Sequence, residues 1–104
     1  MNRSKRLPVI AVSAVLFIFL IYFVQTISQG KELFMREGCS GCHSFKGHGG
    51  TLGPDLTTLG ERRSTLWVME QIRAPRSHNP DSRMPEFGHI SILERYAITL
   101  FLRD

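Results

Sequence analysis

The sequence predicts an all-α protein in which one N-terminal transmembrane helix precedes a small helical domain. Residues 7–24 form an apolar run without a charge. Three later segments carry apolar residues at helical spacing or helix-capping signals, and no segment shows the alternation that marks a half-buried strand. With 104 residues, the chain has room for the membrane segment and one small domain.

The uncharged run from Leu7 to Val24 is long enough to cross a bilayer. As an α-helix it measures about 27 Å, close to the thickness of the hydrocarbon layer. Arg3, Lys5 and Arg6 precede it, and such basic residues stay on the cytoplasmic side. We therefore expect a cytoplasmic basic tail at residues 1–6, a transmembrane anchor at 7–24 and a domain at 25–104 on the periplasmic or extracytoplasmic side.

A cleaved signal peptide is the alternative for this segment, because a basic flank precedes signal peptides as well. The run exceeds the ~7 to 15 residues of a usual signal h-region, and no clear A-x-A site follows it, although cleavage after Ser28 stays open. We favour an uncleaved anchor. Both alternatives place the remaining chain outside the cytoplasm.

The most specific motif follows the anchor, where Cys39-Ser40-Gly41-Cys42-His43 has the CxxCH spacing of a c-type haem attachment site. Each of the two thiols can bond a vinyl group of the porphyrin, and the imidazole of His43 can bind the iron. We therefore predict one covalent haem c. The outer domain of about eighty residues would have a marginal apolar core on its own, so the porphyrin would also complete the core.

Three other uses of Cys39 and Cys42 fit the sequence less well. A structural disulfide between them would close a very short ring and stabilise the fold little. A thioredoxin-like dithiol needs a βαβ framework, which the pattern does not predict. A zinc site needs two further ligands; His48 and His78 are available, but no second paired motif accompanies them.

Two helices are expected to flank the haem motif. The first covers residues 29–37, with Ser28 as N-cap, Leu33 and Phe34 on its apolar face, and Gly38 at its end. The second covers residues 65–73, capped by Ser64 and ended by Pro75. Its apolar residues recur at helical spacing, namely Leu66, Val68, Met69 and Ile72.

The last helix has the clearest signals. Ser91 and Glu94 form an S-x-x-E capping box at its start. An apolar stripe follows, made of Ile92, Leu93, Tyr96, Ala97, Leu100 and Phe101. Residues 47–54 and 74–88 are rich in glycine or proline, which predicts ordered loops rather than strands.

The iron needs a sixth ligand, and Met84 is the candidate. It lies forty-one residues after His43, in a proline-containing loop with charged neighbours. A thioether favours the ferrous state and raises the potential relative to a second imidazole. Met69 and Met35 fit the role of core filler. The alternative distal ligands, which would lower the potential, are His48, His78 and His89.

Taken together, these residues give the outer domain a resemblance to the class I cytochromes c from about Gly30 to Leu102. The resemblance implies a compact helical fold around one haem, in which the first and last helices cross where Gly30, Phe34 and Tyr96 meet. It also implies that Pro54, in the Gly53-Pro54 pair, presents its carbonyl to the proximal imidazole. The order of elements is similar to that of the small cytochrome subunit of nitric oxide reductases and of anchored cytochromes that shuttle between respiratory complexes.

Three further residues have weaker assignments. Trp67 can donate its indole N–H to a haem propionate, or it can serve only in packing. Arg62, with its neighbour Arg63, can neutralise a propionate, although at least one of the two is expected to be solvated. Asp55 can cap the segment after Pro54.

The predicted function is that of a membrane-anchored monohaem cytochrome c that carries single electrons between respiratory redox partners. With His43 and Met84 as axial ligands, no substrate can reach the iron, so the protein is expected not to be an enzyme. The alternative is a fixed electron-entry subunit of a membrane oxidase or reductase complex. A gas sensor is a third hypothesis, weakened by the lack of a signalling domain in this chain. The outer portion is nearly neutral, with ten basic against nine acidic residues, and no nucleic-acid partner is expected.

Overall fold

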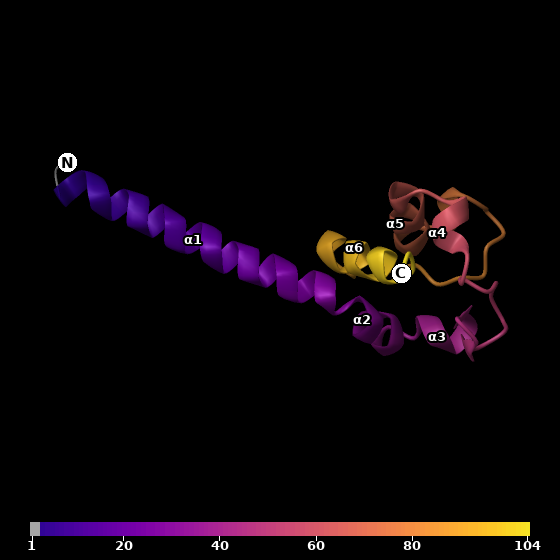
Figure 1. Cartoon of the computed structure of the whole chain (residues 1–104). Coiled ribbons are helices and arrows are strands. Elements are labelled where there is room, and N and C mark those ends of the chain that lie inside the picture. Colours follow the sequence, from indigo (N-terminus) through magenta and orange to yellow (C-terminus); the bar gives the residue numbers. More distant parts are fainter. Residues whose placement is uncertain (1–2) are drawn as a thin grey trace.

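The computed structural model describes residues 3–104, so residues 1 and 2 of the expected cytoplasmic tail lie outside the described residues. The all-α prediction is confirmed, because helices form nearly all of the regular structure (Figure 1). The elements are α1 (Arg3–Ser28), α2 (Gly30–Arg36), α3 (Cys39–Cys42), β1 (Ser44–Phe45), β2 (His48–Gly49), α4 (Leu59–Arg62), α5 (Thr65–Arg73), the 3-10 turn η1 (Pro75–Ser77) and α6 (Ile92–Phe101).

Helix α1 extends away from the domain as one long helix (Figure 1). Its portion Arg6–Ser28 is long and apolar enough to cross a membrane, judged by length and composition. The helix continues past Val24 to Ser28. In this last turn Thr26 is buried and Ile27 packs against the apolar core of the domain. The end of the apolar helix is therefore also part of the domain.

The start of the next helix differs from the sequence prediction. Ser28 was expected to be its N-cap and is not, because α1 runs through Ser28, whose hydroxyl donates to the carbonyl oxygen of Gln25 at 2.8 Å. A serine inside a helix commonly bonds back to the preceding turn in this way. Gln29 occupies the N-cap position of α2 without a side-chain bond. Gly38, with a φ of 82°, ends α2 as predicted.

Helix α6 is at the centre of the domain and packs against α1, α2 and α5 (Figure 1). Three aromatic rings meet beside it, with ring centres of Phe34 and Phe101 5.6 Å apart and those of Phe45 and Phe101 5.0 Å apart. Burying such rings contributes much of the apolar stabilisation. The fully buried apolar residues are Leu33, Phe34, Phe45, Val68, Ile72, Ile90, Ala97, Ile98 and Leu102.

Some expected core residues lie on the surface. Ile92 and Leu66, which were assigned to apolar helix faces, are 69% and 78% exposed. Both line an open hollow between α5 and α6, so their side chains stay in contact with solvent. Met35 is 57% exposed, so its expected role as core filler is wrong.

The crossing of α2 and α6 depends on Gly30. A Cβ atom at this position would lie 2.2 Å from the carbonyl oxygen of Ala97 and 2.9 Å from Cβ of Phe101. The two backbones therefore approach as closely as a glycine permits. The resemblance implied that Tyr96 of α6 packs on Phe34. In the structure the aromatic ring of α6 that packs on Phe34 is Phe101.

The capping predictions for the other two helices are confirmed. Helix α5 has the expected bounds, and the Ser64 hydroxyl accepts the backbone N–H of Trp67 at 3.1 Å. At α6, the Ser91 hydroxyl accepts the N–H of Glu94, whose carboxylate accepts the N–H of Ser91. Both ends of this capping box satisfy N–H groups that a helix leaves unpaired.

A short hairpin stands where only a loop was expected. Strands β1 and β2 pair antiparallel, with Ser44 opposite Gly49 and Phe45 opposite His48. Lys46 and Gly47 connect them, both with positive φ, as in the tight turns that favour two-residue hairpins. The hairpin turns the chain back toward α3 directly after His43.

We predict that Gly30→Ala destabilises the domain by about 2 kcal/mol, because the new methyl group overlaps the backbone of α6 and forces the helices apart. The gain in helix propensity, about 1 kcal/mol, does not offset this. Thermal unfolding of the haem-loaded protein in detergent, followed by circular dichroism, tests the prediction. Gly41→Ala is the matched control, since nothing lies within 4 Å of a Cβ there; equal melting temperatures for the two variants would contradict the prediction.

Candidate haem site

Helix α3 carries the two cysteines of the CxxCH motif. Cys39 and Cys42 are half-buried and do not form a disulfide. Burial raises the pKa of the Cys39 thiol to about 11, so this thiol is protonated at neutral pH. Redox-active CxxC pairs need a lowered thiol pKa. This difference counts against the thioredoxin-like alternative.

His43 follows directly at the C-terminal end of α3, where its backbone N–H donates to the carbonyl oxygen of Cys39 at 3.0 Å. Its ring is oriented by Pro54, because Nδ1 donates to the Pro54 carbonyl oxygen at 2.8 Å. With the proton on Nδ1, the lone pair is on Nε2, the nitrogen that remains available to a metal. A Cβ atom at residue 53 would lie 2.6 Å from Cε1 of His43, so Gly53 gives the ring its space.

The segment that carries Pro54 is bonded back to α3 and β1 by its backbone. The N–H of Gly53 donates to the carbonyl oxygen of Cys42 at 2.7 Å, and the N–H of Leu56 donates to that of Ser44 at 2.8 Å. These two bonds stand on either side of Pro54. They fix the position of its carbonyl relative to His43.

Asp55 adds side-chain bonds to the same segment. Its carboxylate accepts the backbone N–H of Thr57 at 2.7 Å and the hydroxyl of Ser44 at 2.9 Å. The hydrogen bonds from Thr57 are the main cause of a lowered pKa of the Asp55 carboxyl, and the one from Ser44 acts in the same direction. The capping role expected for Asp55 is confirmed.

Met84 is half-buried in the loop between η1 and α6. Its sulfur accepts a hydrogen bond from the side-chain amide of Gln71, with Nε2 and Sδ 3.5 Å apart. Its backbone N–H donates to the Ser82 hydroxyl at 3.3 Å, and its carbonyl oxygen accepts from Arg76 at 3.2 Å. The sulfur and the backbone of Met84 are thus both held by neighbouring side chains.

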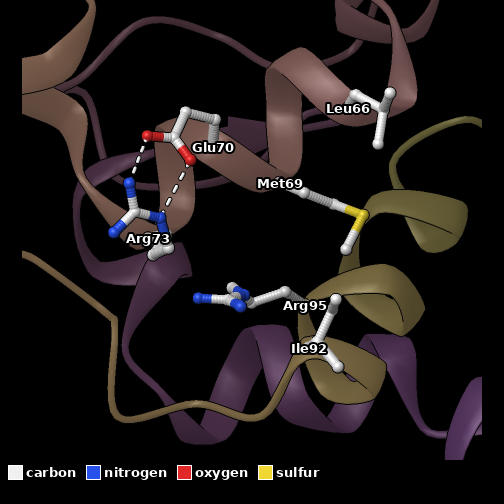
Figure 2. Close-up of a pocket in the computed structure, with 6 residues that line it drawn as sticks. All are labelled: Leu66, Met69, Glu70, Arg73, Ile92 and Arg95. Atoms are coloured by element: carbon white, nitrogen blue, oxygen red, sulfur yellow. Dashed lines mark hydrogen bonds and ion pairs between the residues drawn. The ribbon is translucent and has the colours of Figure 1, made fainter.

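Met69 differs from Met84 in its surroundings. It lines an open hollow of about 250 Å³ between α5 and α6, and its sulfur extends toward α6 (Figure 2). The Glu70–Arg73 ion pair lies at the rim of this hollow. Met69 is half-buried beside this hollow and lies outside the buried core, so its expected role as core filler stays a prediction. The lining residues are Leu66, Met69, Glu70, Arg73, Ile92 and Arg95.

The three histidines considered as distal ligands lie in different places. His48 is exposed on β2. Nε2 of His89 lies 3.4 Å from a carboxylate oxygen of Glu37. His78 stacks on Trp67, with ring centres 4.2 Å apart and planes inclined by 3°. Within residues 3–104, no three His, Cys, Asp or Glu side chains gather closely enough to hold a metal ion, which leaves the zinc alternative without a site there.

Trp67 and Arg62 keep their proposed roles as predictions. The guanidinium of Arg63 lies over the Trp67 ring at 4.4 Å. Arg62 and Arg63 are both exposed, which agrees with the solvated alternative. Arg62 Nε donates to the Thr58 hydroxyl at 3.3 Å. Among the described residues, no acceptor pairs with the indole N–H of Trp67, so this donor is available to a bound group.

The structure brings the site residues together in two groups. The first contains the CxxCH motif with Pro54 against His43. The second contains Trp67 and Met84, which Gln71 and His78 connect. Sequence reasoning missed Gln71 and Arg76, because neither lies in a motif and their contacts with the Met84 loop form only in the folded chain.

The available groups fit a covalent haem. Two thiols in one helical turn, an imidazole with Nε2 available and a half-buried thioether are the donors that attachment and axial ligation require. The bond from His43 to Pro54 also gives the ring the orienting partner that ligating histidines usually have.

Comparisons with known proteins agree with this donor set. Residues 27–104 match the family described as Cytochrome c. The chain is also similar to "Cytochrome c oxidase subunit 2" of Alkalihalophilus pseudofirmus, at 31% identity over 85 residues, which cover 74% of this chain and 25% of that protein. The chain thus spans about a quarter of the length of this curated relative. No solved structure matches. Since the family match covers three quarters of the chain and includes the CxxCH motif, the protein belongs to the cytochrome c family, as an electron-transfer protein with one covalent haem c.

Proposed function

We propose that this protein is a membrane-anchored monohaem cytochrome that carries single electrons between respiratory redox partners, with His43 and Met84 as axial ligands. The observation that carries the proposal is the 2.8 Å hydrogen bond from His43 Nδ1 to Pro54 beside the attachment motif. It orients the imidazole and leaves Nε2 for the iron. When bound, the haem supplies an iron that alternates between the ferric and ferrous states.

The surroundings of Met84 support its role as the sixth ligand. The sulfur is half-buried and accepts a bond from Gln71, and the loop is held by Arg76. A soft, neutral thioether stabilises the ferrous state relative to a second imidazole. With both axial positions filled by protein, no site remains for a substrate, which favours a carrier over an enzyme.

The packing of α1 supports retention of the N-terminal helix as an anchor. Thr26 and Ile27 belong to the packed part of the domain, and α1 contacts α6 along its last turns. Cleavage after Ser28 would remove these contacts. With the basic residues before the run on the cytoplasmic side, the haem domain lies on the extracytoplasmic side of the membrane.

A fixed subunit of a membrane oxidase or reductase is the second candidate. Only Gln29 separates α1 from α2, so the domain has no flexible linker by which to swing between distant partners. The similarity to a protein named as an oxidase subunit points in the same direction. In either case we expect redox partners at the same membrane and a small docking surface.

We predict that Met84→Ala gives a ferric haem with a high-spin spectrum, a ferrous haem that binds carbon monoxide, and a lower reduction potential. The reason is the loss of a neutral ligand that favours the ferrous state. Absorption spectroscopy and a redox titration measure these changes. Met69→Ala is the control and should keep the parent spectrum, since Met69 lines the hollow between α5 and α6. An unchanged spectrum in Met84→Ala would exclude Met84 as the ligand.

Replacing both Cys39 and Cys42 by Ala should make the haem extractable under denaturing conditions and leave the outer domain poorly folded. The covalent bonds would be gone, and the apolar core is marginal without the porphyrin. Haem staining after denaturing electrophoresis measures attachment. The exposed control Gly41→Ala should retain covalent haem; retention by the double variant would refute the attachment site.

Purification from native membranes in mild detergent distinguishes the carrier from the subunit. A fixed subunit should elute with larger membrane chains in constant ratio, also after a wash at high salt that screens surface charges. A free carrier should elute alone. If the ferrous wild-type protein binds carbon monoxide readily, the electron-carrier proposal fails and the gas-sensor hypothesis gains support.

A further inference from the structure

We propose that Arg76 and His78, on either side of Ser77 at the end of η1, are positioning residues that hold Met84 in the orientation from which its sulfur binds the iron. The inference rests on the proposed ligation by Met84. It concerns how the chain keeps this ligand in place.

Arg76 holds the backbone around Met84. Its Nη1 donates to the carbonyl oxygens of Ser82 at 3.1 Å and Met84 at 3.2 Å. Its Nη2 lies 3.0 Å from a carboxylate oxygen of Glu86. One planar guanidinium thus joins three alternate residues of the segment 82–86. A lysine ammonium, which is a single point of charge, cannot reproduce this geometry.

His78 acts on the other side, through the amide of Gln71. Its Nδ1 donates to Oε1 of Gln71 at 2.8 Å, and Nε2 of Gln71 donates to Sδ of Met84 at 3.5 Å. A side-chain amide has a donor end and an acceptor end. Because His78 occupies the acceptor end, the donor end is turned toward the sulfur.

The ring of His78 is itself held, although the residue is exposed. It stacks on one side chain, Trp67, with nearly parallel planes. The guanidinium of Arg63 also lies over the Trp67 ring. Stacking and cation–π contacts of this kind restrict the rotation of exposed side chains. The order of contacts is Arg63, Trp67, His78, Gln71 and Met84.

With these contacts in place, the state in which the sulfur is away from the iron would have a low population. A competing ligand would bind only to that state, so its apparent affinity would fall in proportion to the population. Hydrogen bonds to a charged guanidinium change such populations by about tenfold or more. Arg76 and His78 would therefore keep the site closed to small molecules without touching the iron.

The test uses the full haem-loaded chain in detergent and imidazole as the competing ligand. In Arg76→Lys and His78→Phe, the ferric protein should bind imidazole about tenfold more tightly than the wild type. The long-wavelength absorption band of the methionine–iron bond should disappear on heating before the helical circular dichroism signal does. His78→Phe retains a ring for Trp67 but cannot donate to Gln71.

Two matched controls separate positioning from a general effect of charge or side-chain loss. Arg83→Lys changes an exposed arginine next to Met84 that makes no hydrogen bond or ion pair within residues 3–104. His48→Phe changes an exposed histidine on β2. Both should bind imidazole as the wild type does.

Gln71→Glu provides a second route, because it keeps an acceptor for His78 but removes the donor that faces the sulfur. It should also bind imidazole more tightly. If the band and the helical signal are lost together in Arg76→Lys and in Gln71→Glu, these residues are merely structural and the inference is overturned.

Met84→Ala makes the two proposals distinguishable. If it binds imidazole much more tightly while Arg76→Lys and His78→Phe match the wild type, the ligation stands and the positioning inference falls. If Met84→Ala binds imidazole no more tightly than the wild type, the ligation itself fails and the inference fails with it.

Discussion

The hydrogen bond from His43 to Pro54 is the interaction on which the arrangement of the candidate haem site depends. An imidazole that rotates freely cannot present the same nitrogen to a metal in both oxidation states. The bond at 2.8 Å removes that freedom. To form it, the chain must reverse direction directly after α3, which the positive φ angles of Lys46 and Gly47 make possible. The glycine at position 53 then lets the backbone approach the ring.

The features that could be predicted from the sequence are those with short-range causes. The cap of α5 at Ser64 and the capping box of α6 involve residues three positions apart, so the sequence itself contains both partners. The end of α2 at Gly38 requires only one residue with positive φ. The CxxCH motif is likewise contained within five residues, and the family match agrees with it.

The features that could not be predicted depend on packing between distant segments. Ser is a residue type favoured at N-caps, but the role of Ser28 depends on where α1 ends, and α1 runs through Ser28 while it packs against α6. The choice between Tyr96 and Phe101 as the partner of Phe34 depends on the rotation of α6 about its axis. The spacing of apolar residues along α6 shows how wide its apolar face is. It does not show which residue of that face meets Phe34.

The same reasoning explains why the contacts around Met84 could not be predicted from the sequence. Met84 itself was proposed as a ligand from its proline-rich loop and its forty-one-residue separation from His43, and that role stays a prediction. Its partners come from the end of α5 and from the turn after it, and their contacts arise only when that turn folds back over the loop. A charged or amide side chain in a surface turn carries no sequence signal of such a contact.

Helix α6 connects the proposed membrane anchor to the haem site. It packs against α1 on one side and against α5, which carries Trp67 and Gln71, on another. An anchor on a flexible linker would raise the local concentration of the domain for every partner in the membrane. If α1 is the anchor proposed above, its packing on the domain would act differently, because it would fix the height and the orientation of the haem relative to the bilayer. For the proposed carrier and for a fixed subunit alike, such an anchor would raise the effective concentration only for partners whose redox centre lies at a matching height above the bilayer.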